Sequence, residues 1–198
     1  GGSRAIELGL ISIPKTKSIA TLLSLIAIIF GTMTLFSTHN SNIFTVVIIT
    51  ITALLLGYFY TAPPIRLVAR NGLGELSIFT VFGPLLILGT SFSIYNGDFL
   101  TSNYFFDLLL LSVPVGLLTT NILLINEFPD YEGDLKTGKN HLVATFGKKN
   151  SRYIYLFNLV IISLVTFYSA IISNPILFLP LLFIIIYGTK ITVHIFKN

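Results

Sequence analysis

Residues 18–36 read SIATLLSLIAIIFGTMTLF, a stretch that contains no charged side chain. A helix of about 20 apolar residues crosses the roughly 30 Å hydrocarbon core of a bilayer. The chain contains five such runs, at 18–36, 43–60, 76–95, 105–125 and 153–172, and a sixth begins near Pro175. Lys190 and His194 interrupt the sixth run and leave its end open. Since backbone groups in lipid must be satisfied within their own segment, these runs predict an all-α, multi-pass transmembrane helical bundle.

The composition excludes several other classes of protein. Of the 198 residues, 54% are hydrophobic and 10% are charged, which leaves too little polar surface for a soluble domain. The absence of cysteine excludes disulfides, thiolate metal sites and cysteine nucleophiles. A net charge of +4 would indicate nucleic acid only if the basic residues formed one soluble patch. They lie between the apolar runs instead, so the predicted partner is the lipid bilayer and not nucleic acid.

The basic residues also predict the orientation of the chain. When the loops are assigned alternately to two sides of the membrane, all 12 lysine and arginine residues fall on one side. The loops of the other side contain none of them and include Asp98. Lysine and arginine are retained on the cytoplasmic side of membrane proteins. We therefore expect a cell-membrane protein with both termini, and any active site on the basic side, facing the cytoplasm.

A polar segment, 126–134, reads NEFPDYEGD and follows the fourth run. It places Asn126, Asp130 and Asp134 at steps of four, so on a helix they share one face with a drift of about 40° per step. Two carboxylates and an amide are oxygen ligands of the kind that suit Mg²⁺. The alternative is a solvated acidic loop without a role. Pro129 predicts a kink or a restart of the helix, because proline removes a backbone hydrogen bond.

Basic and aromatic residues near this segment extend the hypothesis to a phosphate. Lys136 and Lys139 follow the acids directly. Residues 58–66, YFYTAPPIR, end the second run with tandem prolines that stop a helix. Here Arg66 and Arg70 are candidates for binding phosphate oxygens, and Tyr60 offers its ring face to a cation. The alternative is an interfacial aromatic belt followed by ordinary inside-positive charge.

The other ionisable residues give weaker signals. Glu75 is either a site residue or an acid in the first turn of a helix, where the helix dipole favours negative charge, and we interpret it as the latter. His39, His141 and His194 have no metal-ligand spacing, so none is predicted to bind a metal.

Three stretches together resemble the UbiA superfamily of intramembrane prenyltransferases. Residues 126–134, followed by Gly138-Lys139, resemble the superfamily's second aspartate motif, Asn-x-x-x-Asp-x-x-x-Asp. Residues 60–67, YTAPPIRL, resemble its Tyr-[Ser/Thr]-x-Pro-Pro-x-[Lys/Arg] segment, and residues 4–12, RAIELGLIS, are similar to the stretch that follows its first aspartate motif. The resemblance covers the whole chain as one transmembrane domain, 1–198, corresponding to about spans three to eight of a nine-helix bundle.

The resemblance implies Mg²⁺-dependent transfer of a polyprenyl group from polyprenyl diphosphate to an aromatic acceptor. Asp130 and Asp134 would hold the metal, with Asn126 in support. Four basic residues would neutralise the diphosphate, and Tyr60 would stabilise the allylic cation; the four are Arg66, Arg70, Lys139 and Arg4. The sequence looks most like the branch that uses 1,4-dihydroxy-2-naphthoate in menaquinone biosynthesis. Related branches use 4-hydroxybenzoate, homogentisate, haem or archaeal glycerol lipids.

One departure from the superfamily pattern is the absence of the first aspartate motif, Asn-Asp-x-x-Asp-x-x-x-Asp, from the 198 residues. We therefore expect a domain that is truncated at its N-terminus, and at its C-terminus as well, and that is inactive alone. A membrane transporter without enzymatic activity is the competing class. A transporter would more naturally carry ionisable residues in the middle of its spans, whereas here the acids gather at one face.

Overall fold

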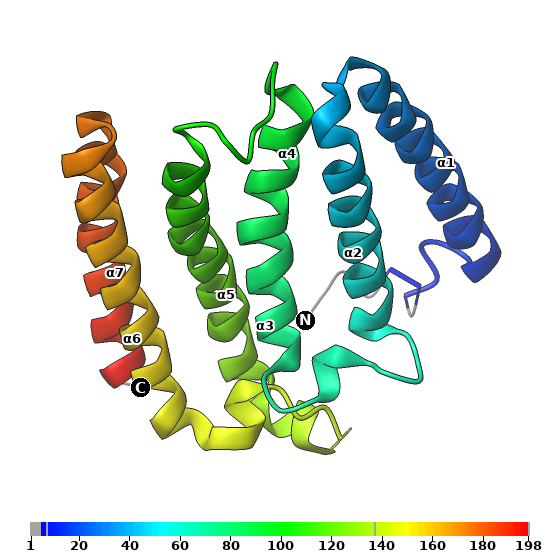
Figure 1. Cartoon of the computed structure of the whole chain (residues 1–198). Coiled ribbons are helices and arrows are strands. Elements are labelled where there is room, and N and C mark those ends of the chain that lie inside the picture. Colours follow the sequence, from blue (N-terminus) through cyan, green and yellow to red (C-terminus); the bar gives the residue numbers. More distant parts are fainter. Residues whose placement is uncertain (1–4, 7, 137, 198) are drawn as a thin grey trace.

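The chain folds as a bundle of long helices in a computed structural model that describes residues 5, 6, 8–136 and 138–197 (Figure 1). In these residues the α-helices are α1 (Ile13–Ser37), α2 (Ile43–Thr61), α3 (Leu73–Thr80), α4 (Leu86–Ile94), α5 (Phe105–Lys136), α6 (Leu142–Ile172) and α7 (Phe178–Lys197). A π-helical turn, Val81–Leu85, joins α3 to α4, so the two form one span. Six spans in this part of the chain are long and apolar enough to cross a membrane. The predicted all-α, multi-pass membrane fold is confirmed.

The helices lie side by side, broadly in chain order from α1 to α7 (Figure 1). Helix α5 packs against α3 on one side and against α6 on the other. The α2–α3 loop and the α5–α6 turn lie at the same end of the bundle, at the bottom of Figure 1. We call this end the site end. The α1–α2, α4–α5 and α6–α7 connections lie at the opposite end, which we call the far end.

The polar segment after the fourth apolar run is more helical than the hydropathy pattern indicates. Helix α5 continues beyond the predicted end of its span at Ile125 and through Pro129 to Lys136. Of the two alternatives predicted at this proline, the restart is wrong and the kink stays a prediction. Helix α6 begins at Leu142 rather than near residue 153, with a break at Gly147, whose φ of 77° and ψ of 158° are not helical. Hydropathy indicates which residues lie in the hydrocarbon core of the bilayer, whereas a helix can extend beyond this core into the aqueous phase.

A close helix crossing fixes the position of α3 against α5. A Cβ atom added to Gly83 would lie 2.7 Å from the carbonyl oxygen of Ser112, and one added to Gly116 would lie 2.7 Å from that of Phe79. Small residues let two membrane helices approach until their backbones touch. Gly83 lies near the middle of the span 73–94 and Gly116 in the first half of α5, so the crossing lies between the two ends of the bundle.

The far end is held by one buried asparagine and a group of aromatic rings. The side chain of Asn42 is fully buried, accepts a hydrogen bond from the Phe99 amide (3.2 Å) and donates to the carbonyl oxygen of Gly97 (2.8 Å). Phe92 packs edge-to-face on Phe99 with 4.8 Å between the ring centroids. The α1–α2 and α4–α5 connections are thereby joined through neutral groups.

Candidate active site

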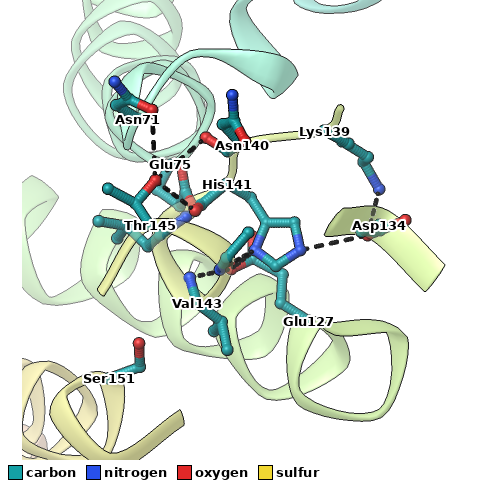
Figure 2. Close-up of polar contacts among 12 residues, drawn as sticks. Asn71, Glu75, Glu127, Asp134, Lys139, Asn140, His141, Val143, Thr145 and Ser151 are labelled. Carbon is teal, nitrogen blue, oxygen red and sulfur yellow. Dashed lines mark hydrogen bonds and ion pairs between the residues drawn. The ribbon is translucent and has the colours of Figure 1, made fainter. Parts of the chain in front are cut away.

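Two loops that are distant in sequence are tied together at the site end. The amide of Asn71, in the α2–α3 loop, donates to the carbonyl oxygen of Asn140, in the α5–α6 turn, over 2.6 Å. The hydroxyl of Thr145 donates to the side-chain oxygen of Asn71 over 3.3 Å, as Figure 2 shows. The loop that carries Arg66 and Arg70 therefore lies beside the turn that follows the acidic segment.

The acidic segment forms the last turns of α5. Asn126, Asp130 and Asp134 all lie within this helix, as the steps of four require for a shared face. Asn126 is exposed, whereas Asp130 and Asp134 are half-buried. The Lys139 ammonium lies 3.0 Å from Asp134 Oδ2. Two residues that the sequence assigned to metal and phosphate binding thus form one ion pair at the start of the turn.

His141 connects Asp134 to a second carboxylate, that of Glu127 (Figure 2). Its Nε2 atom lies 3.2 Å from Asp134 Oδ2, and its Nδ1 atom lies 3.1 Å from Glu127 Oε2. The residue is only 1% exposed. Burial lowers the pKa of His141, although the neighbouring carboxylate of Asp134 acts in the opposite direction. The neutral imidazole is therefore favoured near pH 7.

Three buried side chains cap the N-terminus of α6. The amides of Leu142, Val143 and Ala144 donate to Glu75 Oε1 (2.5 Å), Glu127 Oε2 (3.5 Å) and His141 Nδ1 (3.2 Å), respectively. The first amides of a helix have no partner within it, and the positive end of the helix dipole favours carboxylates nearby. Since Glu75 comes from α3 and Glu127 from α5, this cap joins three helices at one point.

The residues of the second motif occupy the neighbouring loop. Arg70 donates from Nε to the carbonyl oxygen of Ile65 and from Nη2 to that of Pro64 (3.1 Å), so it closes the loop after the tandem prolines. Arg66 is exposed and adopts a positive φ of 49°. Tyr60, at the end of α2, is half-buried and lies within electrostatic range of Glu75 and Glu127. Arg4 lies outside the described residues.

Sequence reasoning missed two members of this site, Glu127 and His141, and interpreted a third, Glu75, as an acid of its own helix rather than as a site residue. One signal for Glu127 was present, because it precedes Asp134 by seven residues and positions seven apart on a helix lie nearly on the same side. The interpretation of Glu75 as an acid in the first turn of its own helix agrees with its position in α3, but its contact is with α6. That contact, and the position of His141 between two acids, depend on folding and have no spacing signal.

The whole length of the chain resembles one family of membrane enzymes. The sequence profile of the UbiA prenyltransferase family matches residues 3–198. The chain belongs to the UbiA prenyltransferase family. No solved structure matches it significantly.

Individual relatives of this UbiA family member include two enzymes of the same name. The chain is 35% identical over 114 residues to the 2-carboxy-1,4-naphthoquinone phytyltransferase of Synechocystis sp., covering 58% of this chain and 35% of that protein. It is 30% identical over 150 residues to the chloroplastic enzyme of that name from Arabidopsis thaliana, covering 71% and 36%. The UbiA prenyltransferase domain-containing protein 1 of Dictyostelium discoideum is 34% identical over 103 residues, covering 51% and 28%. The chain thus spans about a third of the length of these relatives.

Proposed function

We propose that the protein transfers a polyprenyl group from its diphosphate to an aromatic acceptor within the membrane. The observation that carries the proposal is the pair of Asp134 and Lys139, 3.0 Å apart at the end of α5 and beside the loop of Arg66. Carboxylates for a metal and cations for a phosphate thereby lie on the same small surface. Membership of the UbiA prenyltransferase family supports the same reaction class.

Asp130 and Asp134 are the residues proposed to hold Mg²⁺, with Asn126 in support. Their donor atoms are all oxygens and lie on successive turns of one helix, which suits a hard cation that keeps some of its waters and binds phosphate oxygens. The Lys139 ammonium lies 3.0 Å from Asp134 Oδ2, which supports a site for positive charge there. When bound, the ion would neutralise part of the diphosphate charge.

The basic residues of the site end are proposed to bind the remaining diphosphate oxygens. Lys139 pairs with Asp134 at the acidic turn, and Arg66, Arg70 and Arg4 are assigned the same role. Neutralised diphosphate is a better leaving group, so the allylic C–O bond breaks more readily and the pyrophosphate departs with the electron pair. Tyr60 is proposed to stabilise the allylic cation through its ring face until the acceptor ring attacks.

The proposed acceptor is 1,4-dihydroxy-2-naphthoate, which places the protein in menaquinone biosynthesis. The support is that two relatives are named 2-carboxy-1,4-naphthoquinone phytyltransferase. The basic loops at the site end support an orientation in which the site faces the cytoplasm. Residues 1–198 are proposed to form one transmembrane domain that, with one acidic motif, does not turn over substrate alone.

A transfer assay tests this function. The assay uses the full-length protein, meaning residues 1–198 together with any flanking sequence that its gene encodes. This protein is placed in nanodiscs with Mg²⁺ and a radiolabelled polyprenyl diphosphate. It is offered 1,4-dihydroxy-2-naphthoate, 4-hydroxybenzoate and homogentisate in parallel. We expect labelled product from the naphthoate and much less from the other two. Product from another acceptor alone would correct the substrate and keep the enzyme class. Absence of product from every acceptor, with no Mg²⁺-dependent diphosphate binding, would favour the transporter.

A further inference from the structure

Three buried ionisable side chains lie close together near the acidic segment of α5. Glu75, Glu127 and His141 are 3%, 6% and 1% exposed, and each offers one ligand atom within 4.8 Å of those of the other two. They come from α3, from α5 and from the turn before α6 (Figure 2). We propose that these three residues form a site for a divalent transition-metal ion, separate from the Mg²⁺ site proposed at Asp130 and Asp134.

An unused ligand atom is the first indication of a bound ion. Glu75 Oε1 accepts the Leu142 amide, whereas Glu75 Oε2 is buried and has no hydrogen-bond partner in the described part of the chain. A carboxylate oxygen accepts up to two hydrogen bonds, and leaving a buried acceptor without any is unfavourable. The oxygen that is not used by the helix cap is therefore available to a cation among the three residues.

The distances around His141 are those of a metal-bound imidazole with an outer carboxylate. Two ligand atoms that each lie about 2.0–2.1 Å from one tetrahedral zinc ion are about 3.3 Å apart. His141 Nδ1 and Glu127 Oε2 are 3.1 Å apart. On the other side of the ring, Nε2 lies 3.2 Å from Asp134 Oδ2, in the place of the carboxylate that commonly orients a ligating histidine. The Ala144 amide donates to Nδ1 over 3.2 Å, and because this nitrogen has one lone pair, a bound ion would displace that hydrogen bond.

Charge and donor type indicate which ion the site would take. Metal binding would require both carboxylates in their ionised form, which together with a neutral imidazole gives two negative charges, and the N-terminus of α6 supplies only about half a positive charge. A divalent ion would balance the remainder. Mixed imidazole and carboxylate donors suit Zn²⁺, Mn²⁺ or Co²⁺, whereas Mg²⁺ prefers oxygen donors alone. Such an ion would fasten α3, α5 and α6 together and, through His141, hold Asp134 in place.

Cobalt serves as the probe, because Co²⁺ bound to nitrogen and oxygen donors has a visible absorption that Mg²⁺ lacks. The purified full-length protein in detergent is stripped with a chelator and titrated with Co²⁺ in the presence of excess Mg²⁺. We expect one Co²⁺ per chain, a visible absorption band and a higher melting temperature. Glu75→Gln and His141→Asn are expected to weaken Co²⁺ binding at least about 10-fold, whereas the matched control Asp130→Asn retains it.

Three results would overturn the site. The first is a wild-type protein that gains neither a visible band nor a rise in melting temperature, in which case the two carboxyl groups share a proton instead. The second is Co²⁺ binding that Asp130→Asn abolishes, which would place the ion at the acidic segment. The third is unchanged binding in Glu127→Gln, a further variant that serves if Glu75→Gln fails to fold. None of these results bears on the transfer reaction itself, which is measured separately with Mg²⁺ and polyprenyl diphosphate.

Discussion

Helices and connections are joined by buried polar side chains at both ends of the bundle, but the chemical types of these side chains differ. At the far end, Asn42 joins two connections with a neutral amide that accepts from the Phe99 amide and donates to the Gly97 carbonyl. At the site end, the side chains that join α3, α5 and α6 are ionisable, namely Glu75, Glu127 and His141. One of their oxygens, Glu75 Oε2, is buried without a hydrogen-bond partner among the described residues.

This difference separates a structural connection from a site that takes a ligand. Burying a charged group costs several kcal/mol unless it is paired, whereas a satisfied neutral amide costs little. The far end shows that this chain can join its helices without charge. The acids and the imidazole at the site end therefore indicate a requirement for ionisable groups there, and the following variants test that contrast.

The largest expected effect is that of Asp134→Asn on catalysis. Replacing this carboxylate removes a proposed Mg²⁺ ligand and the partner of Lys139, while the size of the side chain is kept. We expect prenyl transfer by the full-length protein to fall by about 10³-fold, equivalent to about 4 kcal/mol of transition-state stabilisation. The matched control is Asp98→Asn at the far end, where the exposed aspartate caps the Leu100 amide, and its turnover should stay at the wild-type level. Equal losses in both variants would remove the distinction between the two ends.

Asn42→Asp tests whether the far end tolerates charge. The substitution buries a carboxylate and removes the donor to the Gly97 carbonyl oxygen. We expect a loss of about 3 kcal/mol in the free energy of unfolding, measured by denaturant titration in detergent. Asn40→Asp, an exposed neighbour in the same connection, is the control and should change stability by less than about 0.5 kcal/mol. A stable Asn42→Asp variant would show that buried charge at either end carries no functional information.

Gly116→Ala tests the helix crossing that leads to the site end. The added methyl group would lie 2.7 Å from the Phe79 carbonyl oxygen and would push α5 away from α3. We expect a loss of about 1–3 kcal/mol in unfolding free energy. Gly57→Ala in α2 is the matched control, since its Cβ would meet no described atom within 4 Å, and alanine there should be neutral or stabilising. If both alanine variants melt like the wild type, backbone contact does not fix this crossing.

The smallest expected effect belongs to Tyr60. Tyr60→Phe keeps the ring face that is proposed to stabilise the allylic cation and should change the rate of transfer by less than about 3-fold. Tyr60→Leu removes the ring and should cost about 10-fold, equivalent to about 1.4 kcal/mol, which is within the range of a cation–π contact. The ratio of the two rates in a transfer assay measures this contribution. A larger loss in Tyr60→Phe than in Tyr60→Leu would assign the role to the hydroxyl group instead.

Most of the fold was predictable because membrane spans are decided by local composition. The apolar runs predicted six spans, and the basic residues predicted that the loop of Arg66 and the acidic segment share one end. The ends of α5 and α6 were not predictable from hydropathy, because polar helical turns extend both helices beyond the apolar runs.

The candidate site was predictable only where its residues are neighbours in the sequence. Asp134 and Lys139 are five positions apart, and the structure brings them into contact. Glu75 reaches the α6 amide of Leu142 across 67 positions, and only the packing of α3 against α5 places it there. The position of Arg66 relative to a bound diphosphate depends on a ligand and stays a prediction.

The central claim is that the α5 carboxylates and the cationic side chains near them bind one metal–diphosphate unit. The most direct test is equilibrium binding of a polyprenyl diphosphate to the full-length protein with and without Mg²⁺. It compares the wild type with Asp130→Asn/Asp134→Asn and with Arg66→Gln/Lys139→Gln. We predict binding that requires Mg²⁺ and that falls at least about 10-fold in both double variants. Binding that is independent of Mg²⁺, or unchanged in both variants, would contradict the account.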